Sequence, residues 1–136
     1  MKKRHVSLLL SLLFSSCRMQ AAPPAFFFDA LHHVETGGRI GPILGDDGKA
    51  LGPLQIHRSY WQDSKVPGRY EDCADLAYSV RVASAYLKKY APRAWEVGDM
   101  QTLARVHNGG PSGTKKSATK VYWQKVEKAL LYVRKN

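Results

Sequence analysis

The apolar positions along the chain predict a mostly helical protein. A first helix is expected where Phe27, Leu31 and Val34 recur at helical spacing. Pro23-Pro24 can open this helix, and Gly37-Gly38 ends it. Four further helices are expected over residues 58–63, 72–90, 100–107 and 118–134.

The two longest predicted helices each have a face suited to burial. In the helix over 72–90 this face consists of Cys73, Leu76, Val80, Ala83 and Leu87. In the helix over 118–134 it consists of Tyr122, Val126, Ala129, Leu130 and Val133. Pro92 is expected to end the first of them, and Asp99 is expected to cap the helix over 100–107.

The segment between the first two helices has a different pattern. Residues 39–56 hold six glycines or prolines among short apolar pieces, and Asp47-Gly48 is a typical hairpin turn. We therefore expect a small β-hairpin over residues 43–56. The predicted fold class is α+β, mostly α, with four or five helices and one hairpin.

The N-terminus has the pattern of a secretory signal peptide. Three basic residues and His5 precede the apolar or small stretch 6–14, which is too short to span a membrane, and small residues follow up to Ala22. We expect residues 1–22 to be removed and residues 23–136 to form one secreted or periplasmic domain without stable membrane insertion. A weaker alternative is lipidation at Cys17.

Charge and cysteine content narrow the classes of function. Removing Lys2, Lys3, Arg4 and Arg18 lowers the formal net charge from +10 to +6, which still suits an anionic partner. Export from the cytoplasm argues against nucleic acid as this partner. Only Cys73 remains after cleavage, so no internal disulfide forms and the core alone must hold the domain. We expect a buried Cys73, no metal site, no cofactor and a monomer.

Glu35 is the first candidate for chemistry, because it continues the apolar stripe of Phe27 and Leu31. A carboxylate is unusual on such a face. Burial penalises the charged form of a carboxyl, so a group placed there can donate a proton near neutral pH. The alternative is a helix end that simply lies in water.

Asp46 and Asp47 follow Glu35 by 11 and 12 residues. A hairpin can bring such a carboxylate opposite the end of the first helix. Two carboxyls in different surroundings on a cleft are the usual equipment for breaking a glycosidic bond. We expect Asp46 on the strand side, nearer the cleft, and Asp47 at the turn in water. The alternative is an ordinary polar turn.

Two further groups of residues suit a glycan. In the segment 107–111, glycines allow close backbone approach, and Asn108 offers both a donor and an acceptor. His107 lies at helical spacing from Leu103, so a core histidine at a helix end is the alternative. Tyr60 and Trp61 are of the kind that stack on sugar rings, or they belong to the core.

Three segments together resemble the invertebrate-type lysozyme family, also called the destabilase family. Glu35-Thr36-Gly37-Gly38 is similar to the family's Glu-Ser-Gly. The run from Asp46 to Gly52-Pro53-Leu54-Gln55-Ile56 and Tyr60-Trp61 resembles its Asp, Gly-x-Phe-Gln-Ile and Tyr-Trp. The segment 104–113 is close to its Ala-Arg-x-His-Asn-Gly-Gly-Pro-x-Gly. The resemblance covers about residues 26–130.

This resemblance implies a lysozyme-like fold and a secreted muramidase that hydrolyses the β-1,4 bonds of peptidoglycan or a related N-acetylated glycan. It places the catalytic acid on Glu35 and the second carboxylate on Asp46, with Asp47 still a candidate. Substrate contacts are expected from Gln55, Tyr60, His107, Asn108 and Gly109.

The chain also departs from the family pattern. Animal members are rich in cysteine, whereas this chain resembles a cysteine-poor, bacterial-style version. The family's Gly-Ser after the second carboxylate reads Gly48-Lys49, and the lysine common after Gln-Ile reads His57. These two changes argue against the isopeptidase activity of some members.

Two other functions stay open on the sequence. Glu-Thr-Gly-Gly and Leu-Gln-Ile also resemble motifs of lytic transglycosylases, which would use Glu35 alone. Asp46-Asp47 argues against that reading. A non-catalytic cell-wall-binding module is the other alternative, and an intact Glu35 argues against it.

Overall fold

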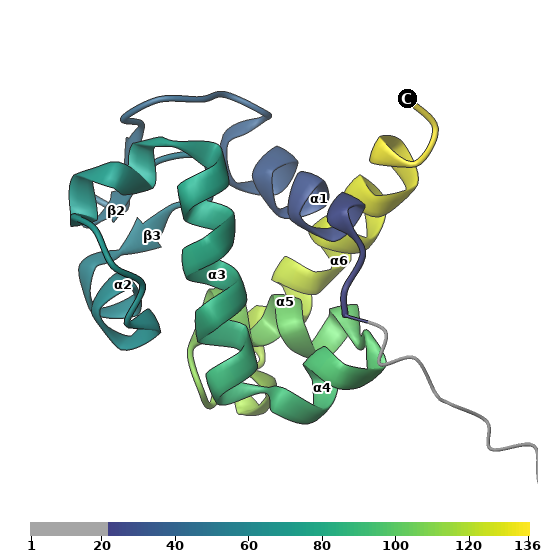
Figure 1. The fold of residues 1–136 in the computed structure, drawn as a ribbon. Coiled ribbons are helices and arrows are strands. Elements are labelled where there is room, and N and C mark those ends of the chain that lie inside the picture. Colours follow the sequence, from purple (N-terminus) through teal and green to yellow (C-terminus); the bar gives the residue numbers. More distant parts are fainter. Residues whose placement is uncertain (1–21) are drawn as a thin grey trace, which may run out of the picture.

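Helices pack beside a small antiparallel sheet, which lies at one side of the molecule, in residues 22–136, the part of the chain that the computed structural model describes (Figure 1). The α-helices are α1 (Ala25–Thr36), α2 (Arg58–Ser64), α3 (Leu76–Tyr90), α4 (Pro92–Val97), α5 (Met100–Gly109) and α6 (Ala118–Val133). Two 3₁₀ helices, η1 and η2, span Tyr70–Ala74 and Gly113–Lys115. The α+β, mostly α class is confirmed. Cys17 and the expected signal peptide, apart from Ala22, lie outside the described residues.

Helix α1 forms as its apolar spacing predicts and carries Glu35 in its last turn. Pro24 is its N-cap, and Phe27 and Leu31 are fully buried. Gly37 ends the helix in the left-handed conformation, where its N–H donates to the carbonyl of His33. Because α1 packs extensively along α6, the position of Glu35 is set by the last helix of the chain.

The expected hairpin is part of a three-stranded sheet. Strands β1 (Leu44–Gly45), β2 (Ala50–Leu51) and β3 (Ile56–His57) pair in that order, each with two residues. Asp47-Gly48 lies in the first turn, as expected, and Gly52 follows β2. Gly52 has φ of 80°, and a Cβ there would collide with the carbonyl oxygen of Cys73, so only glycine fits.

The long helix expected over 72–90 is interrupted near its start. Asp75 has extended backbone angles, and its carboxylate accepts a hydrogen bond from the N–H of Tyr78 at 2.7 Å, which makes it the N-cap of α3. Cys73 therefore lies in η1 and not on α3. The buried face of α3 is Tyr78, Ser79, Val82, Ala83, Tyr86 and Leu87, while Leu76 and Val80 are only half-buried.

Pro92 opens a helix that the sequence analysis did not expect. Ala91 leaves helical geometry and ends α3, and Pro92 becomes the first residue of α4. A proline is tolerated there because the N–H it lacks would have no partner in a first turn. The cap on the next helix is confirmed, since Asp99 accepts hydrogen bonds from the N–H and hydroxyl of Thr102.

The core forms without any cross-link among the described residues. Helix α6 buries Tyr122, Val126, Ala129 and Leu130 as predicted, and Cys73 is a free, fully buried thiol. Within residues 22–136, no helix combines the length and the apolar character needed to cross a membrane.

Cys73 should be chemically inert in the folded protein. Burial, and then the nearby carboxylates of Asp72 and Glu71, raise the pKa of its thiol to about 12. At pH 8 almost no thiolate is present, and the reagent has no access. Alkylation by iodoacetamide, followed by mass spectrometry of the Cys73 peptide, should show labelling only after addition of denaturant. Rapid labelling of the native protein would contradict this placement.

Candidate active site

A cleft of about 710 Å³ collects the residues that the sequence singled out. Its wall comes from the end of α1, the first turn of the sheet, α2 and the C-terminal end of α5. All seven predicted site residues line it: Glu35, Asp46, Gln55, Tyr60, His107, Asn108 and Gly109. Asp47 and Trp61 do not. Residues far apart in the sequence therefore meet in one concave surface.

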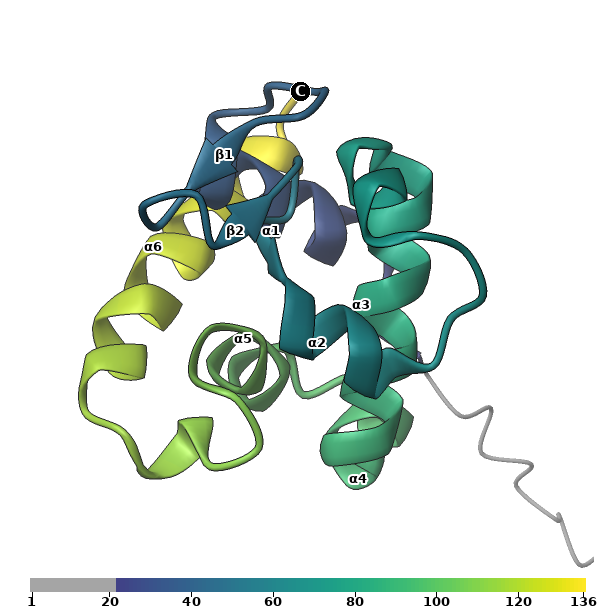
Figure 2. The ribbon, with the colours of Figure 1, turned by 90° about the vertical axis from the view of Figure 1, so that its left-hand side faces the viewer.

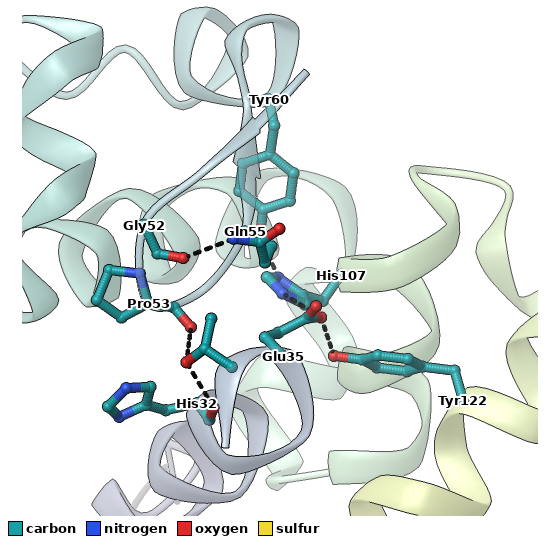
Figure 3. A network of polar contacts seen from close by, with 9 residues as sticks. His32, Glu35, Gly52, Pro53, Gln55, Tyr60, His107 and Tyr122 are labelled. Atoms are coloured by element: carbon teal, nitrogen blue, oxygen red, sulfur yellow. Dashed lines mark hydrogen bonds and ion pairs between the residues drawn. The ribbon is translucent and has the colours of Figure 1, made fainter. Parts of the chain in front are cut away.

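Glu35 is mostly enclosed, with 18% of its side chain exposed. Its Oε1 accepts a hydrogen bond from the hydroxyl of Tyr122 at 2.6 Å and lies 3.6 Å from Nε2 of His107 (Figure 3). One carboxylate oxygen thus faces a donor from α6 and a donor from α5. The carboxyl is fixed in orientation before any substrate arrives.

Tyr122 acts as a permanent donor to this carboxyl. Burial raises its pKa well above 10, and the negative charge of Glu35 raises it further. The phenol therefore keeps its proton near neutral pH. A protonated phenol can donate a hydrogen bond to the charged form of Glu35.

His107 is buried between Tyr60 and Glu35. The hydroxyl of Tyr60 lies 3.0 Å from Nδ1 of His107, and burial raises the pKa of Tyr60 well above 10. When Tyr60 donates to Nδ1, a neutral imidazole carries its proton on Nε2, the nitrogen that faces Glu35.

Of the two readings of the aromatic residues of α2, the structure supports the core and not an open platform for sugar rings. The ring of Tyr60 is buried and stacks on Tyr86, with centroids 3.6 Å apart, so one of its faces is already covered. Trp61 donates from Nε1 to the hydroxyl of Tyr78 and packs against the core. Tyr60 reaches the cleft mainly through its hydroxyl, which orients His107.

Asp46 and Asp47 both lie in the four-residue turn between β1 and β2, so the expected strand position of Asp46 was wrong. Their φ values of 50° and 54° are left-handed, which aspartate tolerates better than most residues. Asp46 nevertheless faces the cleft, where its carboxylate lies 3.2 Å from Nε2 of His57. Its side chain is 58% exposed, so the two cleft carboxyls have unlike surroundings.

Gln55 and Thr36 hold the turn region against α1. The amide nitrogen of Gln55 donates to the carbonyls of Ile43 and Gly52, at 3.1 and 3.0 Å. The Thr36 hydroxyl lies 3.3 Å from the carbonyl oxygen of Pro53 (Figure 3). Gln55 borders the cleft, but its donors are used within the protein, which leaves its side-chain oxygen as the group available to a ligand.

Sequence reasoning missed Tyr122, His57 and Lys116 as site residues. Lys116 lines the cleft and donates from Nζ to the carbonyl of Gly109 at 2.6 Å. The sequence pattern assigned Tyr122 to the core. Because a buried tyrosine hydroxyl usually needs a polar partner, this assignment could have pointed to a polar group beside it. Across residues 22–136, no three His, Cys, Asp or Glu side chains are grouped closely enough to bind a metal ion.

Sequence comparison finds one matching family and several relatives. The sequence model of the destabilase family matches residues 28–129. Lysozyme 1 of Crassostrea virginica is 39% identical over 98 residues, which cover 70% of this chain and 53% of the oyster protein. The lysozyme of Magallana gigas is 31% identical over 121 residues, 87% of each chain. The chain thus spans about half the length of the first relative.

Comparison with solved structures agrees with the sequence comparison. The crystal structure of Tapes japonica lysozyme aligns with a TM-score of 0.67 at 32% identity and covers 79% of this chain and 94% of the other. The lysozyme-like fold expected from the sequence motifs is confirmed.

Loss of the Tyr122 hydroxyl should be costly even though the ring is kept. Tyr122→Phe removes a hydrogen bond to an enclosed carboxyl, and such bonds are worth about 1.5–3 kcal/mol. We expect a loss of that size in the free energy of unfolding, measured with urea. The control is Tyr132→Phe on the same helix, whose exposed ring predicts a change below about 0.5 kcal/mol. Equal effects of the two changes would contradict the role of the hydrogen bond.

Proposed function

Because the chain belongs to the destabilase family of invertebrate-type lysozymes, we propose that it hydrolyses the β-1,4 glycosidic bonds of bacterial peptidoglycan. The observation that carries this proposal is the pair of carboxyls on one cleft, Glu35 mostly enclosed and Asp46 largely exposed. Two carboxyls in unlike surroundings can divide the acid and the nucleophilic or stabilising roles of glycoside hydrolysis.

Glu35 is the proposed general acid. As the acid, it gives its proton to the oxygen of the leaving sugar. The carboxylate left behind accepts a hydrogen bond from the hydroxyl of Tyr122 and lies 3.6 Å from Nε2 of His107. Both groups are in place before the reaction, so the new charge is stabilised without rearrangement.

Asp46 is the proposed second carboxylate. Its side chain is 58% exposed, and its carboxylate lies 3.2 Å from Nε2 of His57. Its negative charge stabilises the oxocarbenium ion that develops as the bond breaks, or its oxygen attacks that carbon directly. Its place in a turn held by Gln55 limits its movement.

Contacts with the N-acetylated glycan are proposed for residues at the end of α5. Asn108 is exposed on the cleft and offers both a donor and an acceptor, and Gly109 allows the sugar to approach the backbone. The proposal includes export, with cleavage after Ala22, and action as a monomer in the periplasm or the medium. No cofactor or nucleic acid takes part.

Replacement of Glu35 by Gln should abolish proton donation while keeping the shape of the side chain. General acid catalysis is worth ~10²–10⁴-fold, and we expect a loss of that order in the turnover of peptidoglycan. Glu96→Gln, the same chemical change at an exposed position of α4, should act like the unchanged protein. Turnover by Glu35→Gln at the level of Glu96→Gln would exclude Glu35 as the acid.

The two aspartates of the turn should differ strongly. Asp46→Asn removes a charge from the cleft and should lower turnover ~10²-fold or more, in the range known for the loss of a charge-stabilising group. Asp47→Asn lies outside the cleft wall and should cost less than ~10-fold. The rate of peptidoglycan hydrolysis is measured for both variants, and mass spectrometry identifies the sugar at the newly formed end of each product.

Reducing ends are the expected product. If both asparagine variants stay active and the products carry anhydro-muramyl ends, a transglycosylase that uses Glu35 alone replaces the hydrolase. If the unchanged protein forms no product, the remaining function is that of a non-catalytic module that binds the cell wall.

A further inference from the structure

The solvent-facing side of α6 combines basic and apolar side chains. Val121, Leu131 and Tyr132 are 56%, 60% and 55% exposed, which is unusual for large apolar groups on one helix side. The basic residues on the same side of the helix and just beyond its end are Lys120, Lys125, Lys128, Arg134 and Lys135. Glu127 is the one acidic residue among them. These nine residues are called the α6 face below.

The positive charge of the α6 face is not neutralised by ion pairs. In the part of the chain that the structure describes, arginines on other elements pair with carboxylates, such as Arg58 with Glu71 and Arg93 with Glu96. No lysine of the α6 face makes such a pair within residues 22–136. Lys125 and Lys128 instead border an open groove of about 390 Å³ beside the stacked rings of His33 and Tyr132.

We propose that the α6 face binds the surface of a bilayer that contains anionic phospholipids. Lysines reach lipid phosphates with their ammonium groups while their alkyl chains cover apolar surface. Val121 and Leu131 can enter the boundary between headgroups and acyl chains, and Tyr132 has the amphipathic ring that favours this boundary. The helix would lie in the plane of the membrane, since it is not built to cross it.

Two other occupants fit the α6 face less well. A polyanion in water would need the lysines but would leave the exposed Val121, Leu131 and Tyr132 without a partner. A second copy of this chain, paired about a twofold axis, would bring lysines against lysines, and like charges repel at an interface. A bilayer with anionic headgroups matches both the charge and the apolar side chains.

Figure 2 provides the basis for a matched control, because α3 and α6 lie on opposite sides of the molecule. Arg81 and Lys88 of α3 are exposed. Replacing both by glutamine removes the same charge as replacing Lys125 and Lys128, but from the other side. A difference in binding between the two double variants therefore depends on which face carries the charge and not on the net charge.

The experiment measures co-sedimentation with vesicles of phosphatidylglycerol and phosphatidylethanolamine, and with vesicles of phosphatidylcholine alone. We expect at least ~10-fold stronger binding to the anionic vesicles. Lys125→Gln with Lys128→Gln should weaken it ~10-fold or more, and Val121→Ser with Leu131→Ser should weaken it similarly. Arg81→Gln with Lys88→Gln should change it less than ~2-fold. All four apolar and basic positions replaced on α6 are exposed, so the variants should fold, which circular dichroism checks.

Three results would overturn the proposal. Equal losses in the α3 and α6 charge variants would mean unspecific attraction. An unaltered affinity of Val121→Ser with Leu131→Ser, together with equally tight binding to soluble polyphosphate, would assign the α6 face to a polymer. A dimer in sedimentation velocity that the α6 variants abolish would assign it to a second copy. Hydrolysis of soluble peptidoglycan fragments should be unchanged in the α6 variants, so the proposed enzyme activity is tested separately.

Discussion

The hydrogen bond between Tyr122 and Glu35 joins residues 87 positions apart and fixes the carboxyl on which the cleft is built. Helices α1 and α6 pack along each other, and this packing brings the phenol to the carboxyl. The same carboxyl oxygen faces His107 of α5, whose ring is turned by Tyr60 of α2. Three helices thus meet at Glu35, and a fourth, α2, is connected to it through His107.

The opposite side of the cleft, which carries Asp46, is formed by a small sheet and not by packed helices. It consists of strands of two residues each, joined by turns, and such a small sheet is not stable by itself. Side chains supply the missing support. Gln55 bonds to backbone on both sides of the turn region, and Thr36 reaches it from α1. The turn that carries Asp46 is therefore supported by side-chain hydrogen bonds to its flanking backbone, whereas Glu35 lies on a helix packed into the core.

The sequence predicted the helical class, the position of Glu35 on α1 and seven of the residues that line the cleft, because these follow from spacing and from motifs. It misplaced features that depend on a single side chain or backbone angle. Asp75 caps α3 and detaches Cys73 from it. Helix α3 ends before Pro92 as expected, but Pro92 also starts α4, which was not expected. The partnerships of Tyr122 with Glu35 and of Asp46 with His57 depend on tertiary contacts, which no local pattern encodes.

Because residues 22–136 contain no disulfide, the folding of this part of the chain does not depend on the oxidation of cysteines. Cys73 is buried and free, and the close contact of Gly52 with the Cys73 carbonyl is made by backbone alone. Neither thiol oxidase nor disulfide isomerase is needed for the domain to reach its structure, and reductants cannot take it apart. The described domain therefore has no internal cross-link that reducing surroundings could break.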